Sequence, residues 1–116
     1  MKRILVVEDE PIIRQALKRL LEKHGFHVDE AGSVKEAKQF SLDSYDLVIS
    51  DLRLPNEAGT AMITLAGETP VLIMTSYASL RSAIDSMKMG AVDYIAKPFD
   101  HEEMLATVER ITEQYQ

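Results

Sequence analysis

Carboxylate side chains collect after two apolar runs of this sequence. Glu8, Asp9 and Glu10 follow one such run, and Asp51 ends another. Carboxylates that lie close together repel one another unless a cation sits among them. Hard oxygen ligands with open positions suit Mg²⁺, which keeps several waters and is commonly completed by a phosphoryl oxygen. The acidic residues therefore indicate a Mg²⁺ site that also handles phosphate.

Two further apolar runs end in side chains that complement such a site. Thr75 offers a hydroxyl, and Lys97 offers an ammonium. A carboxylate nucleophile beside Mg²⁺ can accept a phosphoryl group, because the metal and the ammonium offset the charge on the transferring group. Each residue alone has an ordinary explanation, such as a helix cap, a turn or a solvated strand end. Their combination favours a phosphoryl-transfer site with Asp51 as the acceptor.

These residues can meet only if the runs that carry them are neighbouring strands of one sheet. Five segments have strand character, and the second alternates apolar and polar residues as an edge strand does. Helical patterns separate them, which is typical of an α/β fold with a parallel sheet and helices on both faces. In such a sheet, ligands bind outside the carboxyl ends of the strands. The predicted strands span residues 3–7, 26–31, 46–51, 70–75 and 92–97.

Helices are predicted after each strand. The first begins at Pro11 and ends at Gly25, and the second opens with a capping box at residues 33–36. An apolar stripe at residues 80–87 predicts the fourth helix, and we expect this methionine-containing stripe to pack in the core. The remaining two are a weak helix at 60–66 and a last helix that runs from about 101 to the end at Tyr115 and Gln116.

Composition limits the remaining possibilities. The 116 residues include 13 basic and 19 acidic side chains, and the formal charge of −6 has the wrong sign for direct nucleic-acid binding through phosphate contacts. The absence of cysteine excludes thiolate sites and permits a cytoplasmic location. No apolar run approaches the roughly 18 residues that cross a bilayer, so no membrane association is expected. His24, His27 and His101 lack metal-ligand spacing. The length suits one domain.

Four motifs together resemble the receiver domains of two-component response regulators. They are Glu8 with Asp9, the segment DLRLP at 51–55 with Gly59, Thr75 with Ser76, and YIAKPF at 94–99. The resemblance covers essentially the whole chain, residues 1–116. Residues 83–100 are further similar to receivers attached to sigma-54-dependent (NtrC-type) transcriptional activators. The resemblance implies a flavodoxin-like, CheY-like three-layer fold with strand order 2-1-3-4-5.

The resemblance also implies a role for each acidic residue. Asp51 would accept a phosphoryl group from the phosphohistidine of a sensor histidine kinase. Mg²⁺, for which Mn²⁺ can substitute, would be held by Asp51, by Asp9 directly and by Glu8 through water. The backbone carbonyl of Arg53 would complete the protein ligands. Many relatives have Asp at the position of Glu8, and the longer side chain still permits metal binding through water.

Three further residues take switching roles by the same resemblance. Lys97 would contact the phosphoryl group, and the Lys97–Pro98 peptide bond would be cis. Thr75 would move toward the new phosphate, and Tyr94 would swing inward into the space that it leaves. The alternative for Tyr94 is an exposed aromatic of an edge strand. The switch would act on a surface of the fourth helix, fifth strand and fifth helix. The expected consequences are homodimer formation and regulation through an effector domain attached in the parent chain.

The segment 59–70 departs from the family pattern. Asp51 and Thr75 lie 24 residues apart (75 − 51), which is about one helical turn, or roughly four residues, shorter than in ordinary members. We therefore expect a shortened third helix. This puts in doubt any partner surface built on that helix and leaves the acidic site intact.

Three other functions compete with that of a receiver. A phospho-independent interaction module of the same fold would usually lack one of the acids, the threonine or the lysine, and none is missing. An aspartate-nucleophile phosphatase needs a second acid two residues after its nucleophile, and position 53 is Arg. A flavin-binding protein needs a phosphate loop rich in glycine and hydroxyls after the first strand. We therefore expect a receiver that modifies itself and acts on no outside substrate.

Overall fold

A computed structural model describes residues 1–76 and 80–114. Five parallel strands form one sheet, in the spatial order β2-β1-β3-β6-β7. Counted along the chain, this is the predicted order 2-1-3-4-5, and the second predicted strand lies at an edge. The strands are β1 (Arg3–Val7), β2 (His27–Ala31), β3 (Leu47–Asp51), β6 (Val71–Thr75) and β7 (Asp93–Ala96).

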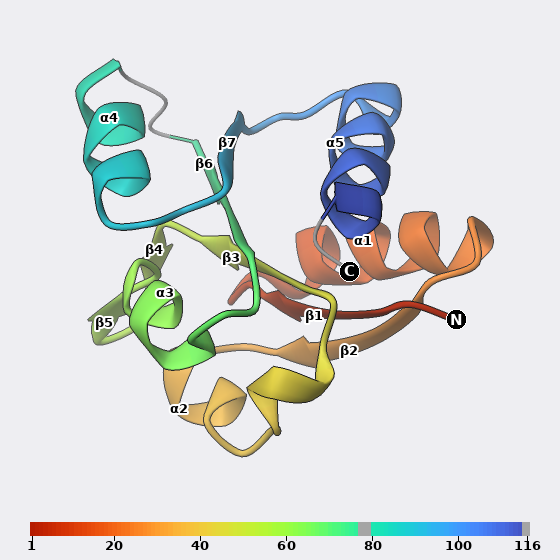
Figure 1. Ribbon diagram of the computed structural model, residues 1–116, viewed down its shortest axis with the longest axis horizontal. Coiled ribbons are helices and arrows are strands. Elements are labelled where there is room, and N and C mark those ends of the chain that lie inside the picture. Colours follow the sequence, from red (N-terminus) through yellow and green to blue (C-terminus); the bar gives the residue numbers. More distant parts are fainter. Residues whose placement is uncertain (77–79, 115–116) are drawn as a thin grey trace.

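Helices cover both faces of this sheet, as predicted. The helices α1 and α5 lie on one side of the strands, and α2, α3 and α4 lie on the other (Figure 1). Each face has its own hydrophobic cluster, because successive residues of a strand point to opposite faces. The bounds are α1 (Pro11–Lys23), α2 (Val34–Ala37), a 3₁₀ turn η1 (Leu42–Ser44), α3 (Ala61–Ala66), α4 (Leu80–Lys88) and α5 (His101–Gln114).

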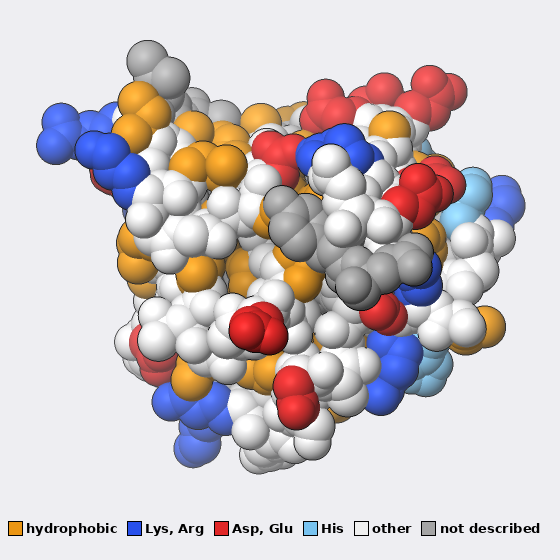
Figure 2. Space-filling view, viewed as in Figure 1, with side chains coloured by type: hydrophobic (Ala, Val, Ile, Leu, Met, Phe, Trp, Pro, Cys, Tyr) orange, Lys and Arg blue, Asp and Glu red, His pale blue; other side chains and the backbone are white. Residues whose placement is uncertain are grey.

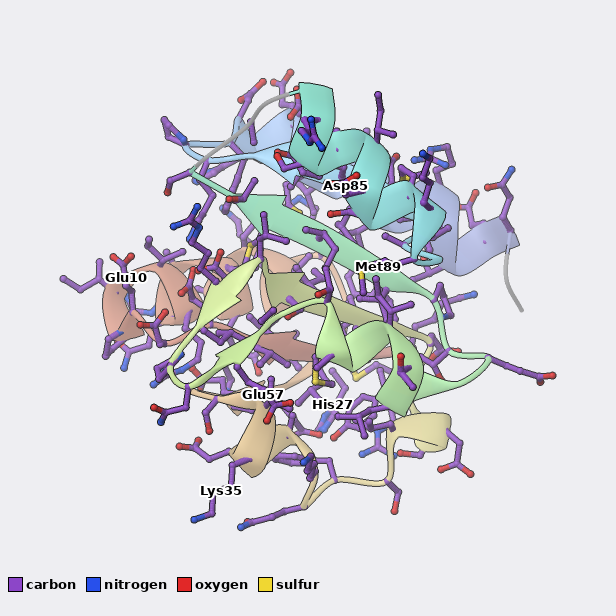
Figure 3. The ribbon with its side chains drawn as sticks, turned by 90° about the vertical axis from the view of Figure 1, so that its left-hand side faces the viewer. Glu10, His27, Lys35, Glu57, Asp85 and Met89 are labelled. Atoms are coloured by element: carbon purple, nitrogen blue, oxygen red, sulfur yellow. The ribbon has the colours of Figure 1, made fainter. Side chains whose placement is uncertain are left out.

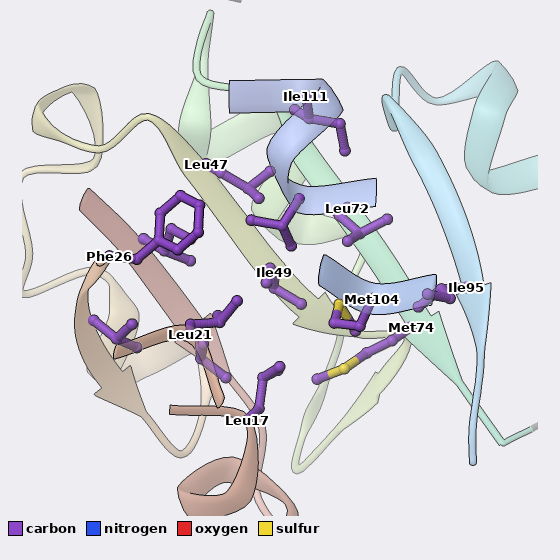
Figure 4. Close-up of a cluster of buried hydrophobic side chains, with 14 residues drawn as sticks. Leu17, Leu21, Phe26, Leu47, Ile49, Leu72, Met74, Ile95, Met104 and Ile111 are labelled. Atoms are coloured by element: carbon purple, nitrogen blue, oxygen red, sulfur yellow. The ribbon is translucent and has the colours of Figure 1, made fainter. Parts of the chain in front are cut away.

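Alternation along β1 shows how the core is divided. Ile4 and Val6 belong to the cluster under α1 and α5, while Leu5 and Val7 belong to the cluster under α2 and α3, and all four are fully buried. Figure 4 shows the first cluster, in which side chains of α1 and α5 converge on β3 and β6. A strand buried on both faces reads as a continuous apolar run, which is why the central strands were predictable.

The register of the sheet aligns the strand ends that carry the polar residues. Val7 pairs with Ser50, Asp51 pairs with Met74, and Thr75 pairs with Ala96. The residues that follow β1, end β3 and β6, and follow β7 therefore meet at one edge of the sheet. The site is predicted from the sequence to lie at this edge.

The helix caps follow the sequence signals. Ser33 Oγ accepts a hydrogen bond from the backbone N–H of Glu36 at 3.1 Å, and Glu36 Oε1 accepts one from the N–H of Gly32 at 2.8 Å. The capping box predicted at 33–36 is therefore present, with its return bond to the residue before the cap. Helix α3 has only 6 residues, which confirms the shortened third helix.

Two features differ from prediction. The segment between Asp51 and the third predicted helix, where the sequence predicts no strand, contains a two-stranded antiparallel sheet, β4 (Arg53–Leu54) and β5 (Glu57–Ala58). The apolar stripe of α4 is not a core stripe, because Ile84 is 44% and Met87 46% exposed while Ser86 is buried. In Figure 2, hydrophobic atoms lie beside Lys and Arg side chains at the upper left, where Figure 1 places α4.

Helix α4 covers an edge strand, β7, and in the described part of the chain no further strand lies beyond β7 to bury large side chains. One polar contact joins α4 to this strand, since Ser82 Oγ lies 3.1 Å from the Tyr94 hydroxyl, and Figure 3 shows the helix with Asp85 and Met89 labelled. The expected helix end at Tyr115 and Gln116 lies outside the described residues. Within the described ranges, no helix combines the length and apolar character needed to span a bilayer.

Candidate metal centre

Three carboxylates meet at the carboxyl edge of the sheet. Glu8, Asp9 and Asp51 each offer one oxygen atom, and these atoms lie within 4.8 Å of one another. Glu8 and Asp51 are buried, whereas Asp9 is exposed. Because all three donors are hard oxygens and one side of the cluster is open to water, the residues fit Mg²⁺, which retains part of its hydration shell.

Lys97 is the residue that follows β7, and its side chain extends into the acidic cluster. Its Nζ donates to Glu8 Oε1 at 2.6 Å and to Asp51 Oδ2 at 3.2 Å, and its side chain is only 6% exposed. Burial alone would lower the pKa of Lys97, but its hydrogen bonds to and attraction by Glu8 and Asp51 outweigh burial and raise the pKa above its ordinary value. The Lys97–Pro98 peptide bond is cis. Lys97 therefore stays charged and joins two of the three acids.

Every polar group of Glu8 has a partner. Its backbone N–H donates to the Ala31 carbonyl at 3.0 Å, and its carbonyl accepts from Arg14 Nη1 at 2.8 Å. Its Oε1 accepts from Lys97, and its Oε2 accepts from the N–H of Glu10 at 3.2 Å. Figure 3 shows Glu10 at the start of α1. Both carboxylate oxygens of Glu8 are therefore engaged in hydrogen bonds.

The burial of Glu8 gives the metal-free protein a distinctive pH dependence. Burial raises the pKa of Glu8 from 4.5 to about 7, although hydrogen bonds from Lys97 and the Glu10 backbone act against it. Between these two values the folded protein holds a proton that the unfolded chain has released. The free-energy cost of ionising Glu8 in the folded protein is therefore absent below pH 4.5 and complete above pH 7. This cost amounts to about 3 kcal/mol.

We accordingly expect the free energy of unfolding of the metal-free protein to fall by up to about 3 kcal/mol as the pH rises from about 5 to about 8. Urea denaturation in EDTA at a series of pH values measures this loss. Glu8→Gln should flatten the dependence, because glutamine has no proton to lose. An unchanged slope in Glu8→Gln would assign the loss to other groups.

The loop after Asp51 packs directly against the backbone of Asp51. Ser50 Oγ donates to the Asp51 carbonyl at 3.0 Å, and the N–H of Gly59 donates to the Leu52 carbonyl at 2.7 Å. A β-carbon built on Gly59 would lie 1.6 Å from the Asp51 carbonyl oxygen, so no side chain fits there. The N–H of Arg53 approaches Asp51 Oδ1 at 3.5 Å. The short hairpin β4–β5 is thus held against the backbone that carries Asp51.

Thr75 and Tyr94 occupy neighbouring strands, and Tyr94 pairs with Ile73, two residues before Thr75. Thr75 is fully buried at the end of β6, and its carbonyl accepts from the N–H of Lys97 at 2.8 Å. Tyr94 in β7 is half-buried against the cluster under α2 and α3, and its hydroxyl lies 3.1 Å from Ser82 Oγ of α4. Tyr94 is thus neither a fully exposed edge aromatic nor a core residue.

Sequence reasoning missed two residues that contact these groups, Arg14 and Ser82. Arg14 is one of the polar residues in the sequence of α1, and it binds the backbone of Glu8. A signal was available, since a cation in the first turns of a helix opposes the helix dipole and therefore indicates an anionic or carbonyl neighbour. The contact of Ser82 with Tyr94 has no local signal, because it joins α4 to β7.

Comparison with known proteins gives a consistent result. The family model of the response regulator receiver domain matches residues 4–109. The chain is 37% identical to the transcriptional regulatory protein DltR of Streptococcus agalactiae, over 97% of this chain and 52% of DltR. It is 35% identical to the response regulator protein PilR of Pseudomonas aeruginosa, over 95% of this chain and 26% of PilR. The chain thus spans about half, or about a quarter, of these curated relatives.

Solved structures agree with these sequence matches. The beryllofluoride-activated NtrC4 receiver domain dimer superposes with a TM-score of 0.91 at 30% identity, and all of both chains is covered. The non-phosphorylated HemR receiver domain from Leptospira biflexa superposes with a TM-score of 0.87 at 33% identity, over 97% of this chain and 94% of that one.

Proposed function

The chain belongs to the response regulator receiver domain family, and on that premise we propose that it accepts a phosphoryl group on Asp51 from the phosphohistidine of a sensor histidine kinase. The observation that carries this proposal is the position of the Asp51 carboxylate among two further acids and a buried ammonium. Clustered carboxylates of this kind are stable only with cations among them, and the transfer uses the same cations.

The transfer forms one bond and breaks another. A carboxylate oxygen of Asp51 attacks phosphorus, the bond from phosphorus to the donor imidazole nitrogen breaks, and the imidazole leaves with the electron pair. Bound Mg²⁺ supplies charge neutralisation for the phosphoryl oxygens. Asp9 and Asp51 hold it directly, Glu8 through water, and the Arg53 backbone carbonyl completes the protein ligands. Lys97, which already contacts Asp51 Oδ2, binds a phosphoryl oxygen.

The product is a local change in charge that biases a surface. An acyl phosphate adds about −1.5 to −2 charge and three acceptor oxygens at one point. Thr75 turns its hydroxyl toward these oxygens, and Tyr94 moves into the space beside it. Since Tyr94 touches Ser82, this movement reaches α4, and the surface of α4, β7 and α5 shifts between two populations.

The chain is proposed to be the receiver part of a longer transcriptional regulator. Two facts support this, namely that the matching relatives are two to four times longer and that their names describe response regulators and transcriptional regulatory proteins. Phosphorylation would act on an effector domain in the parent chain, with homodimer formation through the switching surface as the intermediate step. The dimer form of the NtrC4 receiver supports this second point.

Metal dependence tests the proposal without knowledge of the kinase. Incubation with acetyl phosphate and Mg²⁺ should add the mass of one phosphoryl group, because a small phosphodonor replaces the phosphohistidine. Intact-mass spectrometry measures the gain. The same incubation in EDTA should give none, and Asp9→Asn should slow the gain strongly. A gain that is equal in EDTA would contradict the proposed metal centre.

A further inference from the structure

Arg14 connects three elements around the acidic turn. It lies in α1, and its side chain is 20% exposed. Its Nη1 donates to the Glu8 carbonyl at 2.8 Å, and its Nε donates to Glu30 Oε1 on β2 at 3.2 Å. One planar guanidinium therefore spans from the edge strand to the backbone between β1 and α1.

The position of Arg14 is unfavourable for the helix alone. It is the fourth residue of α1, close to the positive end of the helix dipole, where acidic residues are preferred. Its two hydrogen bonds offset this cost, since bonds from a charged donor are stronger than neutral ones. Neither bond is needed to close the helix or to fill the core. The bond to the Glu8 carbonyl is directed at the segment that carries the acidic residues, and the bond to Glu30 ties the guanidinium to β2.

Glu8 and Asp9 lie in the turn between β1 and α1, where Arg14 adds a restraint on the backbone to those that Lys97 and the Glu10 N–H place on the Glu8 carboxylate. The Glu8 N–H is tied to β2, but its carbonyl has Arg14 as its hydrogen-bond partner. Farther along the turn, the Glu10 N–H donates to Glu8 Oε2 at 3.2 Å, and the Glu10 carbonyl accepts from the Arg14 backbone N–H at 3.0 Å. Arg14 thus holds both ends of the peptide segment from the Glu8 carbonyl to the Glu10 carbonyl, and Asp9 lies between them.

We propose that Arg14 is a positioning residue of the metal centre, which fixes the Glu8 carbonyl and so aims the carboxylates of Glu8 and Asp9 at Asp51. The proposal rests on the proposed Mg²⁺ site. Hydrogen-bonded partners that orient metal ligands typically contribute 10- to 100-fold to metal affinity. Arg14 acts on the ligands through the backbone, and its planar fork of donors matters because one group must reach two acceptors.

Lys18 provides a matched control on the same helix. Its Nζ lies 3.5 Å from Glu30 Oε2, and it is 34% exposed. It therefore shares the charge, the helix and the Glu30 partner of Arg14, and among the residues that the structure describes its ammonium pairs with Glu30 and not with Glu8. Lys18→Gln removes one positive charge near Glu30 and leaves the Glu8 carbonyl bound.

Binding of Mn²⁺, followed by the electron paramagnetic resonance signal of the free ion, tests the proposal apart from phosphorylation. The unmodified protein should bind one ion, and competition with Mg²⁺ gives the Mg²⁺ affinity. Arg14→Gln should weaken the affinities for Mn²⁺ and Mg²⁺ about tenfold, whereas Lys18→Gln should change these affinities less than twofold. Arg14→Lys keeps the charge but cannot span both acceptors, so it should also bind weakly.

A second measurement on the metal-free protein separates positioning from charge. Backbone amides of residues 8–10 should exchange with deuterium faster in Arg14→Gln than in Lys18→Gln. Equal affinity in Arg14→Gln and the parent, full affinity in Arg14→Lys, or unchanged exchange would each overturn the proposal. If the unmodified protein bound no divalent ion, the proposed function itself would fail, and that result is distinct from the three others.

Discussion

Replacing Lys97 by methionine is expected to lower the free energy of unfolding of the metal-free protein by about 3 kcal/mol at pH 8. Lys97 Nζ is the cation between Glu8 and Asp51, and Glu8 is fully buried. Methionine keeps the apolar stem and removes the charge, so two acids lose their partner in a site with little water. The protein should still fold, because domains of this size have about 5–15 kcal/mol of stability.

The loss of stability in Lys97→Met should be smaller when a proton or another cation offsets the negative charge of the two acids. At pH 5 the raised pKa of Glu8 keeps that carboxyl protonated, and Mg²⁺ brings its own positive charge at pH 8. Urea denaturation under the three conditions measures this, with Lys18→Met as the control for an exposed lysine that should change stability by less than about 1 kcal/mol. The response to acetyl phosphate should also weaken. A loss that is independent of pH and Mg²⁺ would show that packing, and not charge, is the contribution of Lys97.

Gly59→Ala is expected to disturb both stability and the metal centre. The new methyl group would lie 1.6 Å from the Asp51 carbonyl oxygen and 2.9 Å from Ser50 Oγ, so the backbone of β3 or of the loop must move. We expect a loss of about 3 kcal/mol, at the upper end for overpacking, since the obstacle is backbone. Because Asp51 itself is displaced, Mg²⁺ affinity should fall as well.

Gly32→Ala is the matched control for this substitution. A β-carbon at Gly32 meets only side-chain atoms of Glu36 and Arg14 at 3.4–3.5 Å, which is ordinary contact. Urea denaturation and Mn²⁺ binding should therefore leave Gly32→Ala close to the parent. If Gly59→Ala were as stable as Gly32→Ala, the close approach of the loop to Asp51 would not hold in solution.

The strands and the site were predictable for the same physical reason. A strand buried on both faces has a continuous apolar run, and its polar end is then conspicuous, as at Asp51 and Thr75. Parallel pairing brings such ends to one edge. The sequence therefore sufficed to bring Glu8, Asp9, Asp51 and Lys97 together, and the distances among them follow from a register that no single run contains.

Other features escaped because they depend on contacts between distant residues. The periodicity of α4 predicted a helix correctly, but a repeat cannot show which face is covered, and Ile84 and Met87 face outward while Ser86 is buried. The strands β4 and β5 have two residues each, too few for an alternating pattern. For the bond from Arg14 to the Glu8 carbonyl, the position of a cation near the start of α1 signals a partner but does not identify it, since the acceptor is backbone.

The site of phosphorylation tests the central claim most directly. After incubation with acetyl phosphate and Mg²⁺, borohydride reduces an aspartyl phosphate to homoserine, and peptide mass spectrometry then locates the altered residue. We predict homoserine at position 51 alone and no phosphoryl gain in Asp51→Asn. The control is Asp46→Asn, which should show an undiminished gain, because Asp46 lies before β3 and its carboxylate accepts a hydrogen bond from the Arg3 backbone N–H. Homoserine at another position, or an equal phosphoryl gain in Asp51→Asn, would contradict the account.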